Sequence, residues 1–214
     1  MQSPVSFTGP DRRRALAAYG ALAAGYDASS HRITGIREAA VAALDLRPGE
    51  TVFDVACGTG STLALLCRRL GPEGRVLGIE QSPEMADLAQ ARLAGCGCRG
   101  ELARSSVQEF ATPLRADAML FTYTHDVLQS DEALDNLARH AHPGCRVAVA
   151  GIRFLPWSWG FAVNAVTAWR TRHYLTTYRG LREPWRGLAA RCRDFRVVRS
   201  FHCGSSYLGV GRLA

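Results

Sequence analysis

The chain has 214 residues, 47% of them hydrophobic, and a formal net charge of +7. This length suits one domain with a full hydrophobic core, residues 1–214. A positive net charge often indicates nucleic-acid binding, but Lys is absent and every cationic residue is Arg. This pattern indicates a bias in the nucleotide composition of the source at least as much as selection for a nucleic-acid partner, so we do not expect nucleic acid as a partner.

Two helices are predicted before the first strand. Residues 1–11 are polar and lack the apolar core of a signal peptide, so we expect a cytoplasmic protein. Residues 11–24 place apolar side chains on one side of a helix, and residues 31–46 do so again before Pro48-Gly49. We therefore expect residues 1–46 to form a helical lid over whatever the following sheet binds.

The next stretch, residues 51–61, reads TVFDVACGTGS and predicts a strand, a glycine turn and the start of a helix. Gly58 and Gly60 lie where the backbone must turn tightly, and the helix that follows offers free N–H groups to a ligand. Dinucleotide sites have a third glycine three residues later, where this chain has Leu63. The turn therefore indicates a nucleotide-like ligand other than NAD or FAD.

Two carboxylates indicate which ligand this is. Glu80 ends the next predicted strand, residues 75–80, where a carboxylate can accept both hydroxyl groups of a ribose. Asp54 adds negative charge where a dinucleotide would place its pyrophosphate, so it favours a cationic ligand. A nucleoside that carries an α-amino group fits both observations, and we predict S-adenosylmethionine.

These motifs resemble a known family. Residues 54–60, DVACGTG, and residues 78–85, GIEQSPEM, resemble motif I and the acidic loop of class I S-adenosylmethionine-dependent methyltransferases. The form of motif I is most similar to that of menaquinone/ubiquinone biosynthesis methyltransferases, and the resemblance covers roughly residues 44–152. It implies an α/β fold with a Rossmann-like, seven-stranded, mostly parallel sheet, a C-terminal antiparallel hairpin and helices on both faces.

The resemblance also implies roles for individual residues. Ser106 stands where the family often has an acid that binds the adenine amino group, and a hydroxyl can still accept that hydrogen bond. Met85 would pack on the adenine ring, or would otherwise be an ordinary core residue. The lid would bring Tyr26 close to the glycine turn, or Tyr26 would otherwise be a half-buried packing residue. The expected cofactor residues are Asp54, Ala56, Gly58, Gly60, Glu80, Gln81, Met85, Ser106, Val107 and Thr122.

The seven cysteines are odd in number, scattered, and unaccompanied by histidines at zinc spacing. We therefore expect reduced thiols and no metal site. Cys96 and Cys98 flank a glycine in a predicted loop, and we interpret this C-x-C pattern as incidental.

The loop after the fourth predicted strand, residues 116–122, faces the transferred methyl group if ligands lie beyond the carboxyl ends of the strands. It lacks the motifs of base-amine and cytosine methylation. His125 is its only base with a pKa suited to neutral pH, so it is the candidate to deprotonate or orient an acceptor. Asp126 could orient His125 or cap the local turn.

Residues 154–187 follow the fifth predicted strand, residues 146–152, and hold all four Trp residues. These aromatic side chains could wall an apolar substrate pocket, form a homodimer interface, or simply cap the sheet. The longest apolar run, residues 155–169, contains Asn164 and is too short to span a bilayer. No membrane-spanning helix is expected.

Two final runs, residues 195–202 and 206–213, predict the hairpin. The favoured function is methyl transfer to O, N, S or C of a small, largely apolar or aromatic metabolite by in-line displacement. Two alternatives stay open, an RNA or protein methyltransferase and a cofactor-binding protein without catalysis.

Overall fold

The computed structural model describes residues 33–172 and 175–214, so the helix predicted over residues 11–24 lies outside the described residues. The fold is built on one seven-stranded sheet with the order β3-β2-β1-β4-β5-β7-β6. Five strands are parallel, and β7 pairs antiparallel with both β5 and β6. The strands are β1 Thr51–Val55, β2 Arg75–Ile79, β3 Arg99–Ala103, β4 Ala116–Thr122, β5 Ala141–Ile152, β6 Arg196–Phe201 and β7 Ser206–Arg212.

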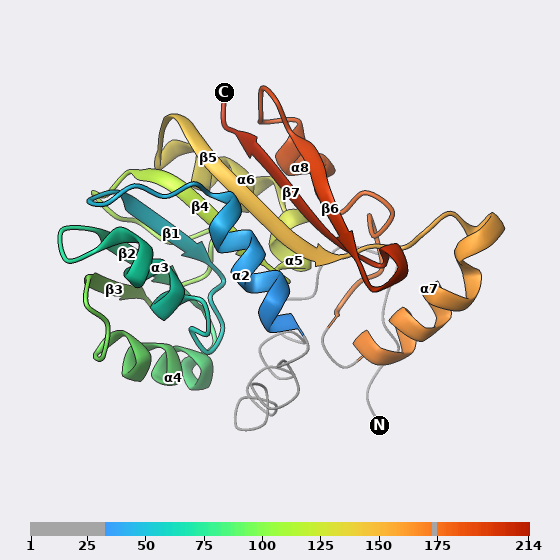
Figure 1. Ribbon diagram of the computed structural model, residues 1–214, viewed down its shortest axis with the longest axis horizontal. Helices are drawn as coiled ribbons and strands as arrows, with labels where there is room; N and C mark the ends of the chain where they lie inside the picture. The colour runs from blue at the N-terminus through green and yellow to red at the C-terminus, as the bar shows by residue number, and fades with distance from the viewer. Residues whose placement is uncertain (1–32, 173–174) are drawn as a thin grey trace.

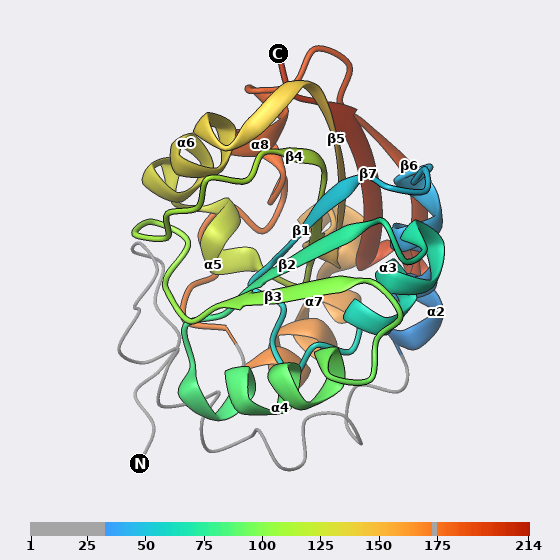
Figure 2. The same ribbon diagram turned by 90° about the vertical axis from the view of Figure 1, so that its left-hand side faces the viewer.

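Helices cover both faces of this sheet (Figures 1 and 2). One face carries α2, α3 and α4, and the other carries α5, α6 and α8. The helices are α2 Thr34–Ala43, α3 Leu63–Leu70, α4 Pro83–Leu93, α5 His125–Leu128, α6 Asp131–Arg139, α7 Trp157–Thr171 and α8 Arg186–Ala189, and a short 3₁₀ turn, His202–Gly204, joins β6 to β7. The predicted fold class is confirmed.

Successive side chains of a central strand point to opposite faces of the sheet, which explains why an apolar cluster lies on each face. Val52 of β1 belongs to the apolar cluster under α2 and α3, whereas Phe53 and Val55 belong to the cluster on the opposite face. All three are fully buried. Central parallel strands are covered on both sides, so their side chains are apolar in both directions.

Several predicted boundaries differ from the observed ones. The predicted helix over residues 31–46 is observed as α2, which packs against β5 through Ile36 and Ala40. The fifth strand starts at Ala141, because Ala116 donates its N–H to His140 and β4 pairs with this early segment. The predicted loop after β4 contains the short helix α5.

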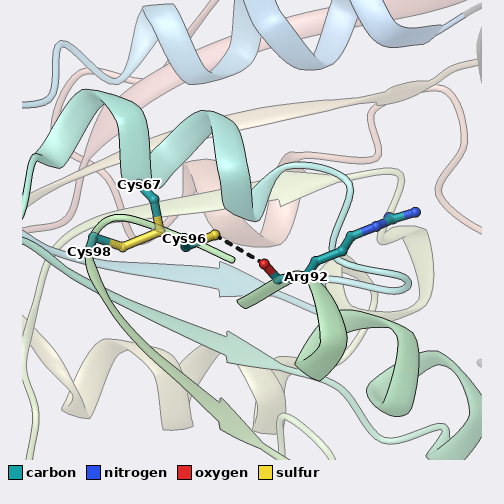
Figure 3. The surroundings of a disulfide bond; sticks show 4 residues. All are labelled: Cys67, Arg92, Cys96 and Cys98. Carbon is teal, nitrogen blue, oxygen red and sulfur yellow. Dashed lines mark hydrogen bonds between the residues drawn. A yellow bond between two sulfur atoms is a disulfide. The ribbon is translucent and has the colours of Figure 1, made fainter. Parts of the chain in front are cut away.

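A disulfide joins Cys67 on α3 to Cys98 before β3, with a Cα–Cα distance of 5.1 Å (Figure 3). The expectation of reduced thiols is therefore wrong for Cys67 and Cys98. The neighbouring Cys96 is a free thiol whose Sγ donates to the Arg92 carbonyl at 3.3 Å. Parallel pairing of β3 with β2 brings Cys98 beside α3, a contact between residues 31 positions apart that local patterns do not reveal.

Within the described ranges no helix is long and apolar enough to cross a membrane. No group of three or more His, Cys, Asp or Glu side chains in the same ranges is arranged to hold a metal ion.

Candidate functional site

A cavity of about 280 Å³ lies where β1, β2, β3 and β4 end. Most of its wall is formed by segments that follow these four strands, which is where open α/β sheets bind ligands. Nine residues predicted from the sequence line it: Ala56, Gly58, Glu80, Gln81, Met85, Val107, Thr122, His125 and Asp126.

The two glycines of the turn have different structural roles. Gly58 has a φ of +57°, and a Cβ built there would meet no atom within 4 Å, so its bare backbone faces open space in the cavity. Gly60 has a φ of +77°, and a Cβ there would lie 2.6 Å from the Leu63 side chain and 3.0 Å from Ala89 Cα. Gly58 therefore leaves space for a ligand, and Gly60 lets α3 and α4 pack closely.

Glu80 holds the turn in place from the end of β2. Its Oε2 accepts the Gly58 N–H at 2.9 Å and its Oε1 accepts the Ser82 N–H at 2.8 Å. Burial raises the pKa of this carboxyl, and the backbone hydrogen bonds oppose that rise. Backbone N–H groups of Gly58, Gln81 and Ser82 take up part of the accepting capacity of its two oxygens, and the capacity that is left can accept a ribose hydroxyl group.

Asp54 and Ser106 do not line the cavity. Asp54 is fully buried at the end of β1, where Thr62 donates to its Oδ2 at 2.5 Å and its Oδ1 has no donor in the described chain. Burial raises the pKa of Asp54 to about 7, while Thr62 and Arg37 act in the opposite direction. Ser106 is also buried and donates to Glu109 Oε2 at 2.7 Å, whereas its neighbour Ser105 does line the cavity.

His125 lies at the start of α5 with a defined proton position. Its Nε2 is 3.0 Å from the Arg179 carbonyl, which can only accept, so Nε2 carries the proton and Nδ1 is the basic nitrogen. Nδ1 is buried and has no hydrogen-bond partner among the described residues. Burial lowers the pKa of His125 to about 4, so the ring is neutral at pH 7. Asp126 accepts from Thr176 at 2.8 Å.

A second, larger cavity of about 810 Å³ adjoins the first. The two share Tyr123, Thr124, His125 and Leu175. Tyr123 has a φ of +60°, a left-handed conformation that is uncommon for a bulky residue and concentrates at functional sites. The remaining wall comes from the end of β5, from α7 and from the β6–β7 connection, and is mostly apolar.

Residues 52–144 match a protein family described as a methyltransferase domain. These residues are a methyltransferase domain, and the resemblance to class I S-adenosylmethionine-dependent methyltransferases is confirmed. The match runs from β1 into β5 and so includes the glycine turn, Glu80 and His125. The expected cofactor, S-adenosylmethionine, is thereby confirmed for the domain type.

Curated relatives of this methyltransferase domain have different activities. A ubiquinone/menaquinone biosynthesis C-methyltransferase of Francisella tularensis is 26% identical over 123 residues, 56% of this chain and 48% of its own. A protein-L-isoaspartate O-methyltransferase of Aeropyrum pernix is 46% identical over 57 residues, 27% of this chain and 22% of its own. The chain thus spans less than half the length of these relatives.

Solved structures extend the likeness of the methyltransferase domain to nearly the whole chain. The N-methyltransferase NodS of Bradyrhizobium japonicum, in complex with S-adenosyl-l-homocysteine, superposes with a TM-score of 0.68 over 94% of this chain and 98% of its own. The two are 15% identical, so this likeness concerns the fold alone.

Two side chains near the site of the methyltransferase domain were missed by sequence reasoning. Thr124 Oγ1 and Tyr207 Oη are buried without a hydrogen-bond partner among the described residues, and both side chains line the larger cavity. Thr124 lies between predicted site residues, so its place in the loop was a usable signal. Tyr207 reaches the site because β7 pairs it with Gly151, and no local pattern predicts that pairing. Tyr26 lies outside the described residues.

Proposed function

We propose that this chain transfers the methyl group of S-adenosylmethionine to a small, largely apolar or aromatic metabolite held in the larger cavity. The observation that carries the proposal is the wall shared by the two cavities. A ligand in the smaller cavity and an acceptor in the larger one would meet at Tyr123, Thr124 and His125. Such proximity supplies much of the rate enhancement of a displacement reaction.

The cofactor supplies an activated methyl group on a sulfonium sulfur. Gly58 and Glu80 would hold its nucleoside, and Met85 and Val107 would pack against the adenine. Asp54 Oδ1 and Ser106 lie behind this wall, and their direct contact with the cofactor stays a prediction.

Neutral His125 would accept a hydrogen bond from the acceptor at Nδ1 and so orient a lone pair toward the methyl carbon. A pKa of about 4 makes it a weak base, which favours orientation over proton removal. The buried hydroxyl groups of Thr124 and Tyr207 can bind polar atoms of the same acceptor. An apolar wall with a few polar atoms suits a hydroxylated aromatic compound.

The experiment starts with calorimetric titration of S-adenosylmethionine, S-adenosylhomocysteine and NAD. We expect binding of the first two and not of NAD. S-adenosylhomocysteine release is then measured with phenols, amines and thiols, and in parallel with RNA and an isoaspartyl peptide. Turnover with RNA or the peptide alone would replace the small-molecule proposal, and no turnover with any acceptor despite cofactor binding would favour a binding protein.

A cavity-filling variant tests where the acceptor binds. Ala162 of α7 lines the larger cavity, so Ala162→Trp should abolish turnover of a small acceptor while S-adenosylmethionine binds normally. Ala165→Trp is the matched control, because Ala165 is an exposed residue of the same helix outside the cavity wall. Equal turnover by the two variants would contradict the assignment of this cavity.

A further inference from the structure

Helix α7 turns its large apolar side chains toward solvent. Trp157, Trp159, Phe161 and Trp169 are 61 to 66% exposed, and Val166 is 54% exposed. The side facing the protein is small or polar, since Gly160, Asn164 and Thr167 are its buried residues. A helix at a protein–water boundary normally has the opposite arrangement.

Contacts of these small or polar residues hold α7 with its large apolar side chains exposed. The Asn164 side chain donates to the Leu155 carbonyl at 2.9 Å and accepts the Leu155 N–H at 2.8 Å. A Cβ on Gly160 would lie 2.3 Å from the Leu155 Cβ, so only glycine allows this close approach. Tyr178 donates to the Ala168 carbonyl at 3.2 Å near the other end. In Figure 1, α7 accordingly lies at the right-hand edge of the molecule, apart from the helices that cover the sheet.

The charge of this segment has one sign. Between Asp135 and Glu183 the sequence contains no Asp or Glu. Arg170 and Arg172 are exposed at the end of α7, and Arg182 is exposed next to its start, where the Phe154 N–H donates to the Leu181 carbonyl. Cationic side chains therefore flank the exposed aromatic side chains of α7 at both ends.

We propose that α7 docks onto an anionic lipid bilayer, with its exposed aromatic side chains in the interfacial layer. Trp side chains concentrate at that depth, and flanking arginines are attracted to acidic headgroups. A helix of 15 residues is shorter than the ~20 needed to cross the hydrocarbon core, so it lies along the surface. A second copy of the chain fits less well, because pairing two α7 helices would bring three exposed arginines of each copy together, and within residues 136–183 only the exposed Glu183 could offset them.

This inference goes beyond the proposed methyl transfer and stands without it. It does add a consequence for the larger cavity, whose wall includes Ala162, Val163 and Val166 of the same helix. A docked α7 would place that cavity beside the lipid, from which an apolar acceptor could enter without crossing water.

The experiment measures co-sedimentation of the full chain with vesicles of phosphatidylcholine, with and without phosphatidylglycerol. We expect binding to the anionic vesicles, weakened by added salt, with a blue shift of Trp emission because three of the four Trp residues lie on α7. The variant Trp157→Ser/Trp159→Ser/Phe161→Ser should bind at least about tenfold more weakly. None of these three side chains lines either cavity, so S-adenosylmethionine affinity should stay unchanged and report correct folding.

Leu88→Ser/Val198→Ser is the matched control, because these exposed apolar residues lie on α4 and β6. It should bind vesicles like the wild type. Arg182→Gln should lower binding to anionic vesicles only. Absence of wild-type binding at low salt, or equal binding by the triple variant, would overturn the proposal. A dimer in vesicle-free solution that the triple variant abolishes would also overturn it in favour of a protein interface.

Discussion

At the scale of single residues, Glu80 connects the glycine turn to the end of β2. Glu80→Gln replaces one accepting oxygen by an NH₂ group that would face an N–H donor of Gly58 or Ser82. Hydrogen bonds to a charged acceptor contribute about 1.5–3 kcal/mol, so we expect S-adenosylmethionine affinity to fall by roughly ten- to a hundredfold. Calorimetric titration measures this loss.

Glu84→Gln is the matched control for Glu80. Its exposed carboxylate accepts from the Ser82 hydroxyl at 2.9 Å but lies outside the cavity wall. Affinity should therefore stay near the wild-type value in this variant. If Glu80→Gln bound the cofactor as tightly as Glu84→Gln does, the ribose assignment of Glu80 would be wrong.

At the scale of elements, the Cys67–Cys98 disulfide ties α3 to the chain that enters β3. It closes a loop with a sequence separation of 31, and chain-entropy arguments give such a cross-link about 3–4 kcal/mol of the free energy of unfolding. Cys98→Ser should lose this amount in denaturant titrations without reductant. With dithiothreitol the wild type and the variant should converge.

Cys96→Ser is the control, since the Cys96 thiol is free and a hydroxyl can donate to the same Arg92 carbonyl. It should retain most of the wild-type stability under both conditions. Equal stability of Cys98→Ser and wild type without reductant would count against the cross-link.

The elements also show what the sequence could predict. Strand β4 and the hairpin followed from short apolar runs and turn signals, and the mostly parallel sheet followed from the resemblance of the DVACGTG turn. Local periodicity could not predict that α7 turns its Trp side chains outward, because that depends on Leu155 occupying the inner side. Nor could it predict Cys67 beside Cys98, or Tyr207 beside Gly151, since strand pairing makes both contacts.

The same limit applies to the candidate site. Nine predicted residues line the smaller cavity because they follow strand ends, a rule that holds for any open parallel sheet. Asp54 belongs to the same motif, yet its side chain points into the core toward Thr62. Motif position gives the place of a residue along the chain, and packing decides which way its side chain points.

At the scale of the whole molecule, two buried groups, one lining the candidate site and one behind its wall, make the free energy of unfolding depend on pH in opposite directions. The pKa of His125 is lowered from 6.5 to about 4, so the unfolded chain binds the proton more readily. The contribution of neutral His125 to the free energy of unfolding is present above pH 6.5 and is lost as the pH falls toward 4. The whole loss is about 3 kcal/mol. The pKa of Asp54 is raised from 3.8 to about 7, so its contribution is present below pH 3.8 and is lost as the pH rises toward 7, by about 4 kcal/mol.

Because the two windows overlap, we expect the free energy of unfolding of the wild type to change little between about pH 4 and pH 6.5. Asp54→Asn keeps an acceptor for Thr62 and removes the carboxyl, so its stability should rise with pH across this window. His125→Gln keeps a donor for the Arg179 carbonyl and removes the titrating ring, so its stability should fall with rising pH. Urea titrations at several pH values measure the slope of unfolding free energy against pH for the wild type and both variants. Parallel slopes would mean that neither group is buried as the structure shows, whereas opposite slopes would identify both as buried titrating groups.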